Sequence, residues 1–378
     1  GAPEEAAGNR RAAGPPRPPP PCLGAAAAAA MRLTPAFVTE ACGGEVLSVR
    51  FSPDDVLLAV ASTRGQVGVH NVTTGKEAYR LNLTETHPVK QVCWRPEAGN
   101  ASLRTRGVLV GVSTGGRLRQ WHCRSSKCIA EFGTPENGQL FCVDYSPDGG
   151  RLVAGGLESL WVFDEETKKE VVHLQGGNYS TAHGHSSRVM GARWRPRAAQ
   201  DPNSLVSGGW DNTVQFWDVR AGHAVRSIDG PHICGDALDV SSDGRTLLTG
   251  SWRDEDQLQF WDFDTGRRLE APQWRRAGLA DPQCFLYTAR FSHDAKSSWV
   301  AAGGSFANPG GGEAKVFASS PAGRAWTSAA GTLDGFTCLT ADFGRSADGA
   351  DPLVALGGAS GRVCVLQASA AAEAAAAA

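Results

Sequence analysis

One short pattern recurs seven times along this chain of 378 residues. Each copy is a strand-like triplet, in which two apolar residues flank a variable one: Val49–Phe51, Val92–Trp94, Val143–Tyr145, Ala192–Trp194, Leu238–Val240, Ala289–Phe291 and Ala341–Phe343. From the first copy to the last, the average spacing is about 49 residues. Such a period is typical of repeat proteins, whose stacked units bury one continuous core.

A second triplet follows each of the first ones at the end of a later strand-like run. The seven copies of this second triplet are Val69–Asn71, Gln120–His122, Val162–Asp164, Phe216–Asp218, Phe260–Asp262, Val316–Ala318 and Val365–Gln367. Pro, Asp and Gly lie where the first strand of a repeat must reverse, as in Ser52–Asp55, Ser146–Gly149 and Ser242–Gly244. These residues tolerate the dihedral angles of tight turns, so each repeat is predicted to be a set of short antiparallel strands.

The fourth repeat is the most complete. It opens with Gly184-His185 and ends some thirty residues later with Trp217-Asp218, with Asp211 in a turn between them. This combination resembles a WD40 repeat. The resemblance implies an all-β fold, a single seven-bladed β-propeller with four antiparallel strands in each blade. Only this repeat and the next one keep the Trp-Asp pair intact.

The resemblance covers residues 33–368 and divides the chain into three parts. A Pro- and Ala-rich tail at 1–32 and an Ala-rich tail at 369–378 flank the propeller, and Met31 is a candidate alternative start. The blades are expected at about 41–81, 82–132, 133–174, 175–228, 229–270, 271–327 and 328–368. Blade seven has three strands by this count, so we expect residues 33–40 to supply the fourth and close the ring. Closure removes two sheet edges that invite aggregation.

The resemblance also implies a polar network inside blade four. His185 is expected to donate to Asp211, and Ser207 and Trp217 are expected to extend the network along their strands. A buried Asp is costly unless its hydrogen bonds are complete, which gives these four residues a structural role.

Charge and cysteine usage limit the possible partners and cofactors. The chain has 37 basic and 39 acidic residues, a net charge of −2, so no overall field attracts nucleic acid or membrane phosphates. No apolar run approaches the ~18 residues of a membrane span. Neither nucleic acid nor a membrane is therefore expected as a partner. The one cysteine cluster, His122-Cys123 with Cys128, lacks the spacing and the fourth ligand of a zinc site, so no metal or cofactor is expected.

The sequence matches a catalytic motif by its letters but lacks the structural context that this motif requires. Residues 111–115 match the letters of a Gly-x-Ser-x-Gly elbow, but that elbow requires a helix after the strand, and another strand-like run follows here. A catalytic propeller would need convergent His, Asp or Glu side chains on the innermost strands. Those strands read Val-x-Phe and Ala-x-Trp, so no catalytic residue is expected and the chain is predicted not to be an enzyme.

A binding surface is expected on the top face, which carries the loops into each blade and the turns between second and third strands. One turn position holds a large apolar residue in blades three to five, Leu157, Trp210 and Trp252. The other four blades have small residues there, Thr63, Thr114, Ser305 and Ala359. Exposed tryptophans are common hot spots of protein interfaces, whereas the alternative is that both indoles tuck against neighbouring blades. Arg188 and Arg253 are the expected polar anchors for a protein partner.

The favoured function is a non-catalytic scaffold that mediates protein–protein interactions in a multiprotein complex. A composition like that of algal proteins favours a cytoplasmic location in a cilium or the cytoskeleton, with an axonemal assembly. The alternatives are a subunit or adaptor of an enzyme complex, such as a ubiquitin-ligase substrate receptor, and a chromatin or trafficking scaffold. Propellers host many unrelated activities, so the sequence specifies the fold better than the function.

Overall fold

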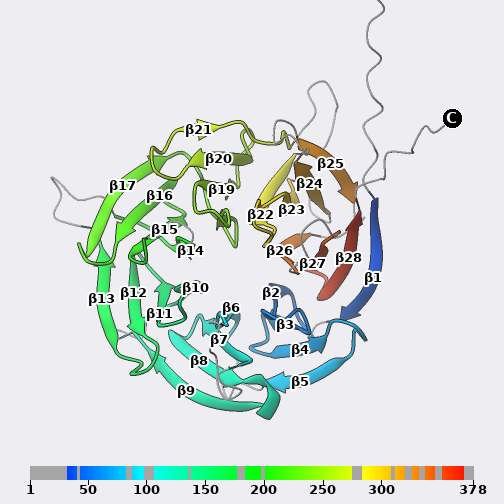
Figure 1. The fold of residues 1–378 in the computed structure, drawn as a ribbon, viewed down its shortest axis with the longest axis horizontal. Coiled ribbons are helices and arrows are strands. Elements are labelled where there is room, and N and C mark those ends of the chain that lie inside the picture. Colours follow the sequence, from blue (N-terminus) through cyan, green and yellow to red (C-terminus); the bar gives the residue numbers. More distant parts are fainter. Residues whose placement is uncertain are drawn as a thin grey trace, which may run out of the picture.

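The computed structural model describes residues 32–40, 43–81, 87–97, 106–134, 138–176, 184–196, 201–274, 283–307, 311–319, 326–331, 337–344 and 351–369. These residues form seven four-stranded antiparallel sheets, arranged as blades around a central axis (Figure 1). The prediction of an all-β, seven-bladed propeller is confirmed. The predicted tails, apart from Arg32 and Ser369, lie outside the described residues.

Each blade runs from an inner strand at the axis to an outer strand at the rim. The strands of blades one to three are β2 (Val46–Phe51), β3 (Leu57–Ser62), β4 (Val67–Asn71), β5 (Glu77–Leu81), β6 (Val89–Trp94), β7 (Val108–Ser113), β8 (Arg117–His122), β9 (Lys127–Gly133), β10 (Cys142–Tyr145), β11 (Arg151–Gly155), β12 (Ser159–Asp164) and β13 (Glu170–Gln175). A single 3-10 turn, η1 (Cys123–Ser125), joins β8 to β9 within the described part of the chain.

The other four blades repeat this order. Their strands are β14 (Val189–Trp194), β15 (Ser204–Gly209), β16 (Thr213–Asp218), β17 (His223–Asp229), β18 (Leu238–Val240), β19 (Thr246–Gly250), β20 (Leu258–Asp262), β21 (Arg268–Leu269), β22 (Cys284–Phe291), β23 (Trp299–Phe306), β24 (Gly312–Ser319), β25 (Trp326–Gly331), β26 (Cys338–Phe343), β27 (Leu353–Gly358), β28 (Arg362–Ser369) and β1 (Arg32–Glu40). The expected blade limits fall within one residue of the outer-strand ends, except that β25 continues four residues past 327.

The first strand of the chain closes the ring. β1 pairs with β28 from Arg32 opposite Ser369 to Glu40 opposite Arg362, which gives blade seven the sheet order β1-β28-β27-β26 (Figure 1). The register shifts between Pro35 and Phe37, where the proline has no N–H to give to the ladder. The strand that covers the last edge therefore comes from the opposite end of the described chain.

The apolar residues that end the inner strands pack between blades. They are buried in all seven blades: Phe51, Trp94, Tyr145, Trp194, Val240, Phe291 and Phe343. Most of the hydrophobic clusters join residues of adjacent blades, so the core is a ring around the axis rather than a single centre. Each blade is therefore held by its neighbours, as in other repeat proteins.

Candidate functional site

Blade four contains a continuous chain of hydrogen bonds from a strand to a surface turn. Trp217 Nε1–H donates to Oγ of Ser207 over 2.7 Å, and the same Oγ lies 2.7 Å from Nε2 of His185. Nδ1 of His185 lies 2.7 Å from Oδ2 of Asp211. A neutral His185 with its proton on Nδ1 satisfies every contact in this chain. The structure thus brings together all four residues of the expected network.

Asp211 fixes the turn that carries the residue before it. Its Oδ2 accepts the backbone N–H of Ser186, and its Oδ1 accepts both the backbone N–H and the hydroxyl of Thr213. Burial alone would raise the pKa of Asp211, but His185 and these donors hold it below the ordinary value. The loop into blade four and the β15–β16 turn are locked together, so Trp210 has a defined position.

The three large turn residues are exposed on the top face. The exposed fraction is 49% for Leu157, 39% for Trp210 and 40% for Trp252, so neither indole is buried between blades. The strand registers show that the three occupy equivalent positions, two residues beyond the last pair of β11–β12, β15–β16 and β19–β20.

Arg188 joins Leu157 to Trp210, and Trp252 contacts an aromatic ring of the next blade. The Arg188 guanidinium lies 4.5 Å from the ring centre of Trp210, and the Arg188 backbone forms a bridge with Leu157. Trp252 stacks on Phe285 of blade six with ring centres 4.5 Å apart. We call Leu157, Arg188, Trp210, Trp252 and Phe285 the top-face arc. It spans blades three to six.

Arg253, the other expected anchor, is held by the protein itself. Its Nη1 donates to the backbone oxygen of Gly230 over 2.8 Å, which ties the β19–β20 turn to the loop after β17. Arg188, in contrast, has no ion pair with a described residue. Arg188 is therefore the better placed of the two arginines to meet a partner.

A cavity of about 340 Å³ opens in the middle of this face, at the mouth of the central channel. We call it the mouth. Most of its wall comes from residues that lie three positions before the middle residue of an inner-strand triplet. These residues are Leu47, Lys90, Phe141, Met190, Tyr287 and Leu339. Arg188 connects the mouth to the arc, because its guanidinium lies 5.8 Å from the ring centre of Phe141.

The expectation that no acidic side chains converge on the inner strands was wrong. The middle residues of the seven triplets are Arg50, Cys93, Asp144, Arg193, Asp239, Arg290 and Asp342, and six of them line one cavity of about 170 Å³ in the channel. That expectation rested on the flanking apolar residues, which pack between blades, whereas the middle residues face the axis. Charges alternate around the ring except at the uncharged Cys93, and an odd number of positions cannot alternate completely.

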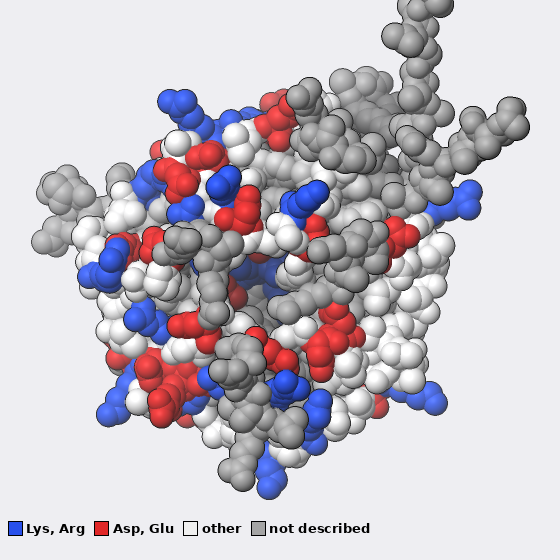
Figure 2. Space-filling model, in the orientation of Figure 1, with Lys and Arg blue, Asp and Glu red and all other residues white. Residues whose placement is uncertain are grey.

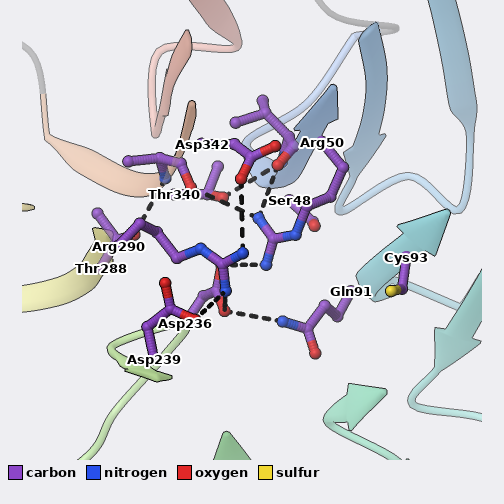
Figure 3. Close-up of polar contacts among 12 residues, drawn as sticks. Ser48, Arg50, Gln91, Cys93, Asp236, Asp239, Thr288, Arg290, Thr340 and Asp342 are labelled. Atoms are coloured by element: carbon purple, nitrogen blue, oxygen red, sulfur yellow. Dashed lines mark hydrogen bonds and ion pairs between the residues drawn. The ribbon is translucent and has the colours of Figure 1, made fainter. Parts of the chain in front are cut away.

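Asp236, which precedes β18, is the hub of this charged centre (Figure 3). Arg50 and Arg193 form close ion pairs with its two carboxylate oxygens, and Nε2 of Gln91 donates to Oδ1 over 2.8 Å. Arg290 lies further off, with Nη1 4.0 Å from Oδ1. Burial alone would raise the pKa of Asp236, but the three arginines hold it below the ordinary range.

The remaining acidic residues of the channel join neighbouring blades. Asp144, Asp239 and Asp342 accept the backbone N–H of Trp194, Phe291 and Phe51 respectively, over 2.8–2.9 Å. Each of these bonds runs from one inner strand to the next around the ring. The carboxylates thus have fixed partners and a structural role, which differs from that of a free catalytic acid or base.

Other kinds of site receive little support from the described residues. No group of three or more His, Cys, Asp or Glu among them is placed to hold a metal ion. Burial raises the pKa of Cys142 to about 12, which makes that thiol unreactive. No helix in the described part of the chain is long and apolar enough to cross a membrane. The face seen in Figure 2 is hollowed at its centre and carries interspersed acidic and basic side chains.

Comparison with known proteins identifies the repeat. The family described as WD domain, G-beta repeat matches residues 126–164 and 176–218. Periodic tryptophan protein 2 of Arabidopsis thaliana is 28% identical over 235 residues, 61% of this chain and 23% of that protein. The guanine nucleotide-binding protein subunit beta of Zea mays is 25% identical over 230 residues, 60% of this chain and 58% of that protein.

A third relative has a name that refers to a complex. Cell division cycle 20.1, cofactor of APC complex, of Arabidopsis thaliana is 24% identical over 233 residues, 58% of this chain and 45% of that protein. The chain thus spans less than two thirds of the length of each of these relatives. Two matched repeats and seven four-stranded blades lead to one conclusion: this chain contains WD40 repeats and folds as a seven-bladed β-propeller.

Proposed function

We propose that this chain is a non-catalytic scaffold that holds a protein partner on its top face within a larger assembly. The top-face arc is the observation that carries the proposal, because it places two half-exposed tryptophans and a leucine at equivalent turns of three consecutive blades. Aromatic residues at the centre of a patch commonly supply most of the binding energy of protein interfaces. The blade-four network supports the same function, since a fixed Trp210 loses little conformational entropy on binding.

The names of the relatives are in keeping with an assembly role. One relative is a subunit of a guanine nucleotide-binding protein, and another is a cofactor of the APC complex. A role as adaptor of an enzyme complex is the second candidate, and the APC cofactor is the observation in its favour. A ciliary or axonemal assembly in the cytoplasm is the setting that we propose to examine first, on the basis of composition.

Affinity purification with matched variants tests the proposal. The test variant is Trp210→Ala with Trp252→Ala, and the control is Val225→Ala with Leu269→Ala. The control residues are also exposed and apolar and belong to the same two blades, but they lie on the outer strands β17 and β21. We expect a partner that the wild type and the control retain and the tryptophan variant loses. Equal recovery by a folded tryptophan variant contradicts the proposal.

A further inference from the structure

The wall of the mouth has a large apolar part beside the polar residues Glu45, Lys90, Gln91 and Thr337, and the charge of its floor is already compensated. Phe141 and Met190 are almost fully buried in its wall, and Leu47, Tyr287 and Leu339 are half-buried around it. Its volume of about 340 Å³ is at the lower end of the roughly 300–1,000 Å³ of small-ligand sites. A single large side chain of a partner is therefore an occupant of suitable size.

The floor does not favour a basic side chain. Asp236 reaches the bottom of the mouth, but Arg50 and Arg193 already pair with its two oxygens, and Gln91 donates to one of them. A lysine or arginine that entered would compete with these fixed partners and approach a cluster of guanidinium groups. An apolar side chain needs no such exchange and gains the contact with the walls.

The rim carries two cations, Lys90 and Arg188, and Arg188 lies over the rings of Trp210 and Phe141. Among the described residues, neither Lys90 nor Arg188 has an ion pair within 4.0 Å, although Glu45 is close enough to interact with Lys90 electrostatically. Burial lowers the pKa of Lys90, Glu45 opposes this effect, and the charge of Arg188 adds to it. An additional carboxylate at this rim would stabilise both cations.

We infer that the mouth binds a segment of the partner in which a large apolar side chain is followed or preceded by an acidic residue. The apolar side chain enters between Phe141, Met190 and Tyr287, and the carboxylate pairs with Lys90 and Arg188. The inference rests on the proposed function, because it describes the chemistry of the partner that the top-face arc would hold. It adds a second contact region, at the axis, to the arc.

Selection from a random-peptide display library tests this chemistry without a known partner. Peptides enriched on the folded wild type should share an apolar residue next to Asp or Glu. Lys90→Glu should weaken the enriched peptides at least tenfold and shift new selections towards basic flanking residues. The matched control is Arg64→Glu, which reverses an exposed cation in the β3–β4 turn, outside the residues that line the mouth.

Blocking the mouth gives an independent readout. Leu47→Trp places a large apolar side chain in the cavity from a half-buried position, so the fold should persist and peptide binding should be lost, with melting temperature as the check. Enrichment of basic peptides, no enrichment at all, or binding that survives both Lys90→Glu and Leu47→Trp overturns the inference. A partner that depends on Trp210 and Trp252 but tolerates Leu47→Trp retains the proposed function and rejects only the role of the mouth.

Discussion

Nδ1 of His185 lies 2.7 Å from Oδ2 of Asp211, and this contact joins the loop that enters blade four to the turn that carries Trp210. Asp211→Ala removes the acceptor shared by His185, Ser186 and Thr213. We expect the free energy of unfolding to fall by about 2–4 kcal/mol, because buried donors lose their partner. Denaturant titration of the purified variant measures the loss.

A double-mutant cycle separates this network from a general loss of packing. His185→Ala alone should cost less than Asp211→Ala, and the double variant should cost clearly less than the sum, because both changes remove one network. Strictly additive losses would show that the two side chains do not interact in solution.

Removal of β1 should have a much larger effect than removal of the residues before it. Without residues 1–31 the melting temperature should stay nearly unchanged, since β1 and its ladder with β28 remain. Without residues 1–40, β28 becomes an unpaired edge and the ring is open, so we expect aggregation. Light scattering during thermal melting compares the two truncations, and identical behaviour would be incompatible with the role of β1 in closure.

The repeat period made the architecture and the blade-four site predictable, whereas the centre of the ring was not. Trp210 and Asp211 are adjacent in sequence, and His185 lies at a spacing fixed within one blade, so a local pattern contains them. Asp236 meets Arg50 only because blades five and one face each other across the axis. That pairing depends on ring closure, which no local spacing encodes.

The arc was predictable only in part for the same reason. The turn position identified Leu157 and Trp252, since the register within a blade repeats. Phe285 contacts Trp252 from the next blade, and Phe141 meets Arg188 across a blade boundary. The alternation of Arg and Asp in the middle of the inner-strand triplets was the available signal for a charged channel.

As a binding hot spot, Trp210 should matter for partner binding and much less for the stability of the fold. The indole is 39% exposed, so its loss should change the free energy of unfolding little, while it should weaken partner binding by about 2 kcal/mol or more. Isothermal titration with the captured partner, alongside a denaturant titration, measures both quantities. A destabilised protein with unchanged affinity would reverse the assignment.

His70 should make blade one sensitive to acid. It is 2% exposed at the Trp position of the third strand, and burial lowers its pKa, which Glu77 and the Gly75 backbone only partly oppose. The imidazole of His70 thus binds a proton less readily in the folded protein than in the unfolded chain. The contribution of neutral His70 to the free energy of unfolding is therefore present above the ordinary His pKa of about 6.5, and it is lost as the pH falls through the lowered value.

A matched pair of variants isolates this effect. His70→Phe introduces the residue found at the equivalent position in blades three and six, and it should reduce the loss of stability between pH 7 and pH 5. His223→Phe changes an exposed histidine and should follow the wild type. Parallel pH profiles for all three proteins would assign the acid sensitivity to other groups.

Two Asp→Asn variants compare the stability contribution of the buried carboxylate in the channel with that of an exposed one. Asp236→Asn leaves Arg50 and Arg193 in the channel without their shared carboxylate, so we expect a loss of about 3–5 kcal/mol in the free energy of unfolding. Asp256→Asn breaks an ion pair with Arg268 in which both side chains are about half exposed, and it should cost about 0–1 kcal/mol. Urea titration followed by tryptophan fluorescence and by circular dichroism compares the two variants. Similar small losses would mean that solvent in the channel replaces the Asp236 contacts and that the charged ring does not hold the blades together.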